Sequence, residues 1–377
     1  MDNSFGYLNG LVYLHGVHVL VITSLKYMAI HQLKTQMSAG NSTCPLDPTL
    51  DKQNSNGHFQ VHWIHWIQWT IRLAISMALY IYMTSMCLSL RPCNTWYEKN
   101  GIVVAILFRG LPNANERDFS EWANNLGYEP FSYVGGVVPR NEIEPNVSEG
   151  AQDDSVITFE PHNEMAYSPR FPKIFSISCL KKSQWGGETA ICDNRDFHVK
   201  LDPAFVQKCE DREIRYWNCL HSKDSYKNRY QSWQMRFKTE DKDNVNDFLK
   251  SQNYHYSWEE NTLFYWKNLS PTKAHPISGK QLWFNQLSSV HASYYDDIPS
   301  YEDLRLAYKE YPAHTTYGDG EEFAEHEIDN HRRCIWESAV GFDWQNGDIL
   351  FLDQMIVQHS RLSFQGDRRV GVSLLNY

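Results

Sequence analysis

The sequence predicts a protein of the α+β class that is mainly β, with antiparallel sheets and flanking helices. Strand-like runs outnumber helical ones, and they do not alternate with helices as they do in parallel βαβ units. The composition also changes near residue 100, which separates a part with long apolar stretches from the rest of the 377 residues. We therefore expect an N-terminal appendage of residues 1–99 and a single domain of residues 100–377.

The N-terminal appendage contains two apolar stretches, Asn3 to Leu25 and Leu73 to Leu90, that carry no Asp, Glu, Lys or Arg. As a helix, the second stretch would span about 27 Å, which is close to the thickness of the hydrocarbon core of a membrane. Aromatic residues precede it, as they often precede a membrane span: Trp63, Trp66 and Trp69. Residues 73–90 are therefore a candidate transmembrane helix, and a buried or interfacial helix is the alternative.

The charge pattern and the cysteines exclude several classes of protein. The net charge of -10 comes from mixed charges, and no cluster of Lys and Arg could follow a phosphate backbone. Nucleic acid is therefore not an expected partner. The eight cysteines form no C-x-x-C pair, which argues against a zinc ribbon and a disulfide scaffold. We expect an intracellular protein, cytoplasmic by default and membrane-anchored if residues 73–90 span a bilayer.

The spacing of apolar residues predicts the helices and strands of residues 100–377. A short buried strand is expected in GIVVAILFRG, and apolar residues at helical spacing predict a helix in DFSEWANNLG. Two more helices are expected at Asp241 to Lys250 and at Ser300 to Tyr311, the latter opened by a capping box of Ser300 and Asp303. Further strands are expected in PKIFSISCL, KQLWFNQL, DILFLD and RRVGVSLLN.

The stretch PHNEMAY contains His162 and Glu164 two positions apart. On a strand, residues i and i+2 point to the same face, so an imidazole nitrogen and a carboxylate oxygen could meet at one point. A third donor must come from elsewhere, and His359, between two expected strands, is the candidate. Two histidines and one carboxylate on one face of an octahedron hold Fe(II) and leave positions open for other ligands.

Three blocks in order resemble the Fe(II)- and 2-oxoglutarate-dependent oxygenases of the taurine dioxygenase (TauD/TfdA) and clavaminate synthase-like family. They are PHNEMAY, WGGETAICDNRDF and GDILFLDQMIVQHSRLSFQGDRR, and the resemblance covers residues 100 to 377. It implies a double-stranded β-helix, or jelly roll, with the iron at one open end. Glutamate at 164, where aspartate is commoner, places the chain nearer the clavaminate synthase-like branch.

The resemblance also implies the roles of individual residues. His162, Glu164 and His359 match the metal ligands, which are the catalytic centre. Arg369 matches the arginine that pairs with the distal carboxylate of 2-oxoglutarate, and Thr189 matches a threonine that assists it. Four residues after Arg369, where taurine-type members have an arginine for a sulfonate, this chain has Ser373. A sulfonate substrate is therefore not expected.

The expected function is a dioxygenase that uses Fe(II), 2-oxoglutarate and O2 to oxidise, by default to hydroxylate, a C–H bond of a small organic metabolite. Succinate and CO2 would be released. A non-catalytic jelly-roll binding module, tethered to a membrane through residues 73–90, is the alternative. A zinc hydrolase on the same three ligands is a third interpretation.

Overall fold

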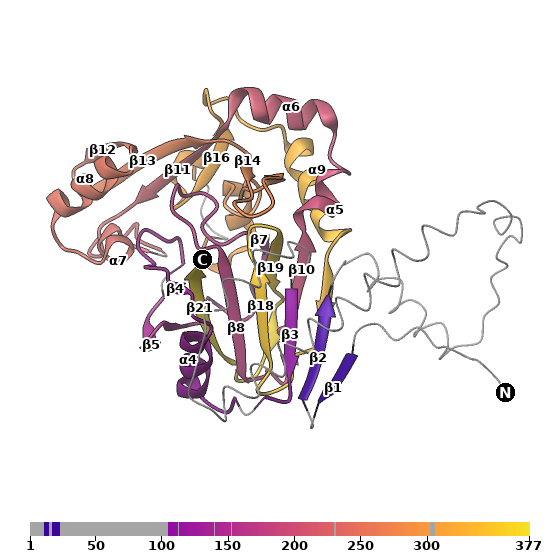
Figure 1. Ribbon diagram of the computed structural model, residues 1–377. Coiled ribbons are helices and arrows are strands. Elements are labelled where there is room, and N and C mark those ends of the chain that lie inside the picture. The colour runs from indigo at the N-terminus through magenta and orange to yellow at the C-terminus, as the bar shows by residue number, and fades with distance from the viewer. Residues whose placement is uncertain are drawn as a thin grey trace, which may run out of the picture.

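The computed structural model describes residues 11–14, 17–22 and 105–377, apart from residues 112, 139, 152, 230 and 302–305. Two antiparallel sheets face each other and enclose the main core, which confirms the expected jelly roll (Figure 1). A third sheet and several helices lie at one end of this sandwich.

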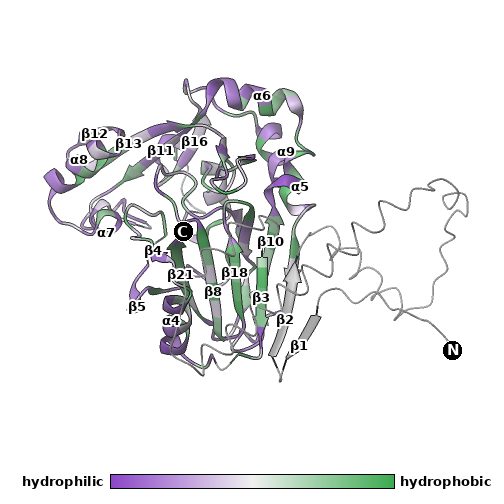
Figure 2. Cartoon of the chain, viewed as in Figure 1, coloured by the Kyte–Doolittle hydropathy of each residue, from purple (hydrophilic) through white to green (hydrophobic). Residues whose placement is uncertain are grey.

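The larger sheet has nine strands in the order β1-β2-β3-β18-β8-β21-β6-β5, and β4 also pairs with β21. Hydrophobic residues dominate its central strands, as Figure 2 shows for β3, β8 and β18. The bounds are β1 (Leu11–Leu14), β2 (Val17–Ile22), β3 (Ala105–Arg109), β4 (Glu129–Pro130), β5 (Glu142–Glu144), β6 (Val147–Glu149), β8 (Ile174–Lys181), β18 (Ile349–Asp353) and β21 (Arg369–Asn376).

The smaller sheet carries the residues on which the functional argument depends. Its order is β17-β10-β19-β7, with every pair antiparallel. The bounds are β7 (Phe159–His162), β10 (Thr189–Asp193), β17 (Val340–Phe342) and β19 (Val357–Arg361). All five residues of β19 are buried, because this strand pairs on both sides and packs against the main core.

A third sheet has the order β12-β13-β11-β16, and its strands and nearby helices enclose a small core of their own. The strands are β11 (Ile214–Leu220), β12 (His255–Glu259), β13 (Thr262–Leu269) and β16 (His314–Tyr317), and the helices are α7 (Trp233–Phe237) and α8 (Lys242–Ser251). Two short pairs complete the strands: β14 (Thr272–Ala274) with β15 (Gln281–Trp283), and β9 (Trp185–Gly186) with β20 (Phe364–Gln365).

The remaining helices lie around the sheets: α4 (Glu116–Asn125), α5 (Asn194–His198), α6 (Pro203–Arg212) and α9 (Glu325–Trp336). Helices α4 and α8 confirm two of the three helices expected from periodicity. The third expectation is wrong in its described part, which forms 3-10 turns at Pro299–Tyr301 and Tyr308–Glu310. Here the buried rings of Tyr301 and Tyr311, with centroids 5.6 Å apart, pack together outside any regular α-helix.

The apolar stretch Asn3 to Leu25 contributes two strands, because β2 pairs with β3 at the edge of the larger sheet and β1 pairs with β2. The candidate transmembrane helix at residues 73–90 lies outside the described residues. In the part of the chain that the structure describes, no helix has the length and apolarity needed to cross a membrane.

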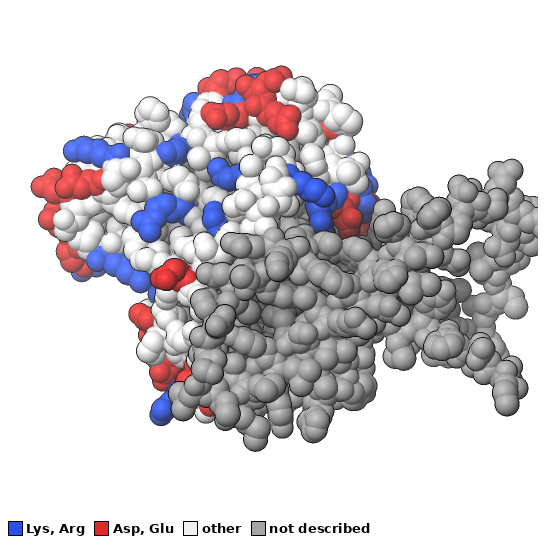
Figure 3. Space-filling model, viewed as in Figure 1, with Lys and Arg blue, Asp and Glu red and all other residues white. Residues whose placement is uncertain are grey.

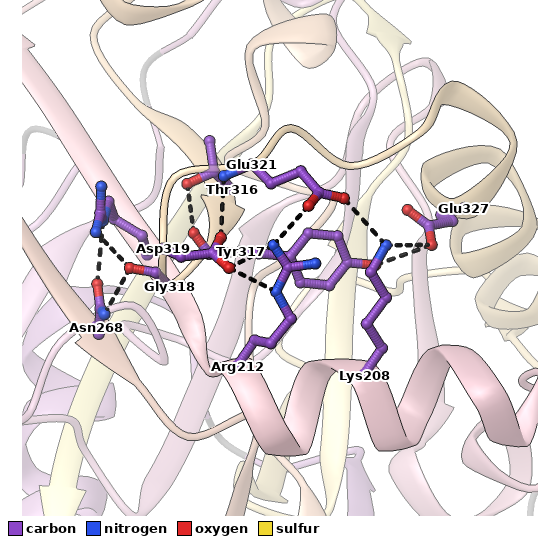
Figure 4. Close-up of polar contacts among 10 residues, drawn as sticks. Lys208, Arg212, Asn268, Thr316, Tyr317, Gly318, Asp319, Glu321 and Glu327 are labelled. Carbon is purple, nitrogen blue, oxygen red and sulfur yellow. Dashed lines mark hydrogen bonds and ion pairs between the residues drawn. The ribbon is translucent and has the colours of Figure 1, made fainter.

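Ionic contacts connect α6 to the loop after β16 and to the first turn of the helix at Glu325–Trp336 (Figure 4). Arg212 contacts Asp319 and Glu321, and Lys208 contacts Glu321 and Glu327. Acidic side chains are frequent over α6 on the visible face (Figure 3). Because these charges are exposed or only half-buried, the network fixes the orientation of α6 more than it adds to stability.

Candidate metal centre

A cavity between the two sheets is lined by residues from both of their inner faces. The larger sheet contributes an apolar wall: Phe175, Ile177, Val370 and Val372. The smaller sheet contributes polar side chains: His162, Thr189, His359 and Arg361. Residues from loops, among them Tyr133, Arg140, Glu164 and Tyr295, complete the lining.

His162 is the last residue of β7, and its ring orientation is fixed by the backbone. Its Nδ1 lies 2.8 Å from the carbonyl oxygen of Glu160, an acceptor, so Nδ1 carries the proton and donates it. Its Nε2 therefore has a free lone pair, and it lies 3.7 Å from Oε2 of Glu164. This arrangement is the one that metal-binding histidines use, with the second nitrogen held by a hydrogen bond.

Glu164 lies just after β7, in a turn and not on the strand. Strand alternation was expected to bring it beside His162, whereas a turn that includes Met165 at φ 56 does so. Asn163 anchors this turn because its side-chain amide donates to the carbonyl of Gln354 at 2.5 Å. The carboxylate of Glu164 is thereby held inside the cavity.

Arg140 is buried beside Glu164, and its Nη2 lies 3.2 Å from each carboxylate oxygen. Burial alone would raise the pKa of Glu164, but the charge of Arg140 and the contacts with His162 and His359 outweigh it and lower the pKa far below its usual range. Glu164 is therefore an anion at neutral pH, as a metal ligand must be. Arg140 was not expected from the sequence to belong to the site.

His359 lies in the centre of β19, opposite His162 on β7 and Ile191 on β10. Its Nε2 is 3.9 Å from Oε2 of Glu164, and its ring stacks on Phe175 at a centroid distance of 3.8 Å. Burial, followed by the charge of His162, holds the pKa of His359 well below its ordinary value. The ring is therefore neutral and can offer a lone pair.

Together, one ligand atom from each of His162, Glu164 and His359 lies within 4.8 Å of the others. Two imidazoles and one carboxylate converge on one point, and the cavity continues beyond them. This donor set fits Fe(II) with positions left for a cosubstrate and dioxygen. The structure thus brings together the three residues that the sequence predicts as ligands.

Arg368, which directly precedes β21, and Arg369, its first residue, point in opposite directions. Arg369 is largely exposed and forms an ion pair with Glu116 of α4, outside the cavity. Arg368 lines the cavity on the same face as Val370 and Val372. Its guanidinium makes no hydrogen bond or ion pair with any described residue. The guanidinium carbon lies 5.5 Å from the centroid of the Phe364 ring. The expectation for Arg369 therefore does not match this geometry, because a shift of one residue turns a side chain to the other face.

Thr189, the first residue of β10, lies in the cavity as expected and is almost fully buried. Its hydroxyl oxygen accepts a hydrogen bond from Nε1 of Trp344 at 3.2 Å, so its own proton is available to another acceptor. Ser373 is buried on the face of β21 opposite the cavity, and the residue four positions after Arg368 is Val372, which lines the cavity.

A second group of potential ligands, His291, His314 and Glu322, differs from the first in its hydrogen bonds. Nδ1 of His291 accepts from the amide of Ser293, and Nδ1 of His314 accepts from the amide of Ala292, both at 3.2 Å. Each Nε2 therefore carries a proton, and that of His314 is donated to Glu322 at 2.7 Å. Two such histidines support the loop structure and have no lone pair free for a metal.

Comparison with known proteins agrees with this geometry. The family model "Taurine catabolism dioxygenase TauD, TfdA family" matches residues 96–375. The dapdiamide synthesis protein DdaC of Enterobacter agglomerans is 29% identical over 275 residues, which is 72% of this chain and 82% of that protein. A clavaminate synthase-like protein of Arabidopsis thaliana is 28% identical over 278 residues, 72% of this chain and 81% of that protein.

Two solved structures are similar at low identity. PvcB of Pseudomonas aeruginosa, described as an Fe, α-ketoglutarate dependent oxygenase, is 13% identical with a TM-score of 0.42, over 76% of this chain and 80% of that one. An asparagine oxygenase is 11% identical with a TM-score of 0.44, over 75% of this chain and 77% of that one. Since the family model spans most of the chain, the protein belongs to the TauD/TfdA family and is an Fe(II)- and 2-oxoglutarate-dependent dioxygenase.

Proposed function

We propose that His162, Glu164 and His359 hold the Fe(II), and that Arg368, assisted by Thr189, binds the distal carboxylate of 2-oxoglutarate. The protein then hydroxylates a C–H bond of a small organic metabolite. The observation that carries this proposal is the convergence of the three ligand atoms in a cavity that also contains Arg368, which has no anionic partner in the described part of the chain.

The fit of Arg368 to a carboxylate follows from its surroundings. Burial, then the charge of Arg361, lowers the pKa of Arg368 to about 10, so it remains a cation at neutral pH. A half-buried cation without a counter-ion among the described residues is costly, and a carboxylate held by a two-pronged guanidinium contact would offset that cost. The hydroxyl proton of Thr189 supplies a further donor on the same wall.

With 2-oxoglutarate and dioxygen, bound Fe(II) supplies an oxidant strong enough to remove hydrogen from carbon, and succinate and CO2 are released. The chain's own residues orient and protect this chemistry. The carbonyl of Glu160 fixes the His162 ring, and Arg140 fixes the Glu164 carboxylate. The apolar wall of Phe175, Ile177, Val370 and Val372 makes this side of the cavity unfavourable for water.

The residues near Arg368 narrow the class of substrate. Val372 occupies the position four residues after Arg368, so no arginine is placed there for a sulfonate. The proposed substrate is therefore a small metabolite other than a sulfonate of the taurine type. We also propose that the oxygenase domain comprises residues 100–377.

The test is the visible charge-transfer band that Fe(II) and 2-oxoglutarate give when both bind one site without oxygen. We expect the band in the wild type, its loss in His359→Ala, and its retention in His326→Ala, which changes an exposed histidine of α9. With a metabolite pool, the wild type and His326→Ala should release succinate, and His359→Ala should not. A band that survives His359→Ala, or turnover that needs only Zn(II) and no oxygen, would contradict the proposal.

A further inference from the structure

A second cavity lies next to the metal cavity and shares part of its wall. Tyr133, Val138 and Arg140 line both cavities, while Gln231, Gln234 and Arg236 line only the second. Arg140, which holds Glu164, therefore stands between the metal ligands and this second space.

Arg236, in α7, is a buried cation without a counter-ion. Only 2% of its surface is exposed, and it forms no ion pair with a described residue. Its Nε donates to Gln231 at 2.7 Å, and its Nη1 donates to Asn218 and to the hydroxyl of Tyr265, both at 2.8 Å. All three acceptors are neutral, and Nη2 has no acceptor among the described residues. Buried charges are normally paired, so this arrangement requires an explanation.

Two other buried donors of this cavity's lining residues have no acceptor in hydrogen-bond geometry among the described residues. They are Nε of Arg140 and the hydroxyl of Tyr133, which interact with each other without meeting that geometry. Three donors without acceptors thus belong to residues that line one cavity. Unmade hydrogen bonds of buried groups are costly, and an oxyanion bound in this cavity would offset that cost, above all at Nη2 of Arg236.

The charges around the cavity indicate how much negative charge it accepts. Arg140 is already balanced by Glu164, and at the exposed rim Lys238 and Glu142 have opposite charges. Arg236 remains with one unbalanced positive charge. This balance fits a monoanion such as a carboxylate better than a phosphate, which carries nearly two negative charges at neutral pH.

We propose that this second cavity binds a carboxylate group of the primary substrate, with Arg236 as the charged donor and Tyr133 and Arg140 as further donors. The substrate class is therefore organic acids whose carboxylate is recognised separately from the carbon that is oxidised. This inference rests on the proposed function, because it takes the ligand of the cavity to be the substrate of the neighbouring metal centre.

The test measures binding to the full-length protein without iron, so that it does not depend on turnover. The probes are 4-fluorophenylacetate and its neutral amide, 4-fluorophenylacetamide, followed by fluorine NMR. We expect the acid to bind at least about tenfold more tightly than the amide, and Arg236→Gln to remove this preference. Arg236→Lys, which keeps the charge, should retain most of the preference.

Two matched variants locate the site. Arg333→Gln changes an exposed arginine of α9 and should bind the acid as the wild type does. Arg368→Gln should also retain binding, because it alters the cosubstrate side of the metal cavity; loss there would place the acid at Arg368 and overturn the inference. Equal binding of acid and amide by the wild type would also overturn it, even if Arg236→Gln fails to fold.

The same measurements separate this inference from the proposed function. The protein could bind the acid through Arg236 and yet show no Fe(II) and 2-oxoglutarate band. That result would contradict the proposed metal and cosubstrate site and leave the carboxylate site standing. A normal band in a protein that binds acid and amide equally would contradict the carboxylate site alone.

Discussion

At the scale of single residues, the charge of Arg368 is the feature on which cosubstrate binding depends. Arg368 and Arg369 are chemically identical neighbours, yet one lines the metal cavity and the other pairs with Glu116 at the surface. The difference comes only from the side of the sheet to which each points. The pair therefore provides a matched experiment within the chain.

Replacing Arg368 by Gln should weaken 2-oxoglutarate binding strongly, whereas Arg369→Gln should leave it nearly unchanged. Loss of one partner from a buried charge pair costs about 2–5 kcal/mol, which corresponds to a rise in the KM for 2-oxoglutarate of roughly 30-fold or more. Succinate release against cosubstrate concentration measures this KM. A larger effect from Arg369→Gln than from Arg368→Gln would return the role to Arg369.

The sequence contained the signal that distinguishes the two arginines. Val370, Val372 and Leu374 alternate with Gly371 and Ser373, so the apolar phase of β21 points inward and includes position 368. The three metal ligands were predictable because their residue types and their order along the chain are distinctive. The second cavity was not, because its donors come from segments far apart in the sequence, and only folding brings them to one wall.

At the scale of elements, helix α9 supports the metal centre through β7. Arg332 of α9 forms an ion pair with the side chain of Glu160 at 2.6 Å, and the carbonyl of Glu160 holds the His162 ring. The preceding residue, His331, is buried, and its Nε2 accepts a hydrogen bond from Trp283 at 3.2 Å. Its neutral state is therefore part of the packing between α9 and β15.

Acid should weaken this packing. Burial, then the charge of Arg332, lowers the pKa of His331 to about 3, whereas an unfolded chain has a histidine pKa near 6.5. Between these values the unfolded state binds more protons, so stability from this group is complete above about pH 6.5 and falls as the pH falls towards 3.

From pH 7 to pH 5 the expected loss is about 2 kcal/mol in the free energy of unfolding for this one histidine. His331→Gln keeps an acceptor for Trp283 and cannot be protonated, so it should show that much less loss. Urea unfolding of both proteins at the two pH values measures the difference, and His326→Ala on the exposed side of α9 is the control. An identical pH dependence in His331→Gln and the wild type would show that His331 is protonated without cost.

At the scale of the whole molecule, the strand patterns in the sequence predict the jelly roll, but they do not predict the outer edge of its larger sheet. The central strands β3, β8 and β18 are short apolar runs, which periodicity identifies. The stretch Asn3 to Leu25 has no charged residues and could equally be read as a helix, so only its pairing with β3 assigns strands to it. Strands β1 and β2, which belong to the segment expected to be an N-terminal appendage, thus extend the larger sheet.

Removing this extension tests how far the catalytic unit depends on it. In a chain shortened to residues 100–377, β3 loses its pairing with β2, from His18 opposite Arg109 to Ile22 opposite Ala105, and exposes an apolar strand edge. Such edges promote association between chains. We expect the shortened protein to give the Fe(II) and 2-oxoglutarate band, with an affinity for 2-oxoglutarate within about threefold of that of the full chain, because the metal ligands lie on the other sheet and its adjoining loops. We also expect it to self-associate in analytical ultracentrifugation. A chain of residues 11–377, which keeps both strands, should remain less associated at the same concentration. If the shortened protein stays monomeric but binds neither iron nor cosubstrate, the catalytic domain includes part of the first 99 residues.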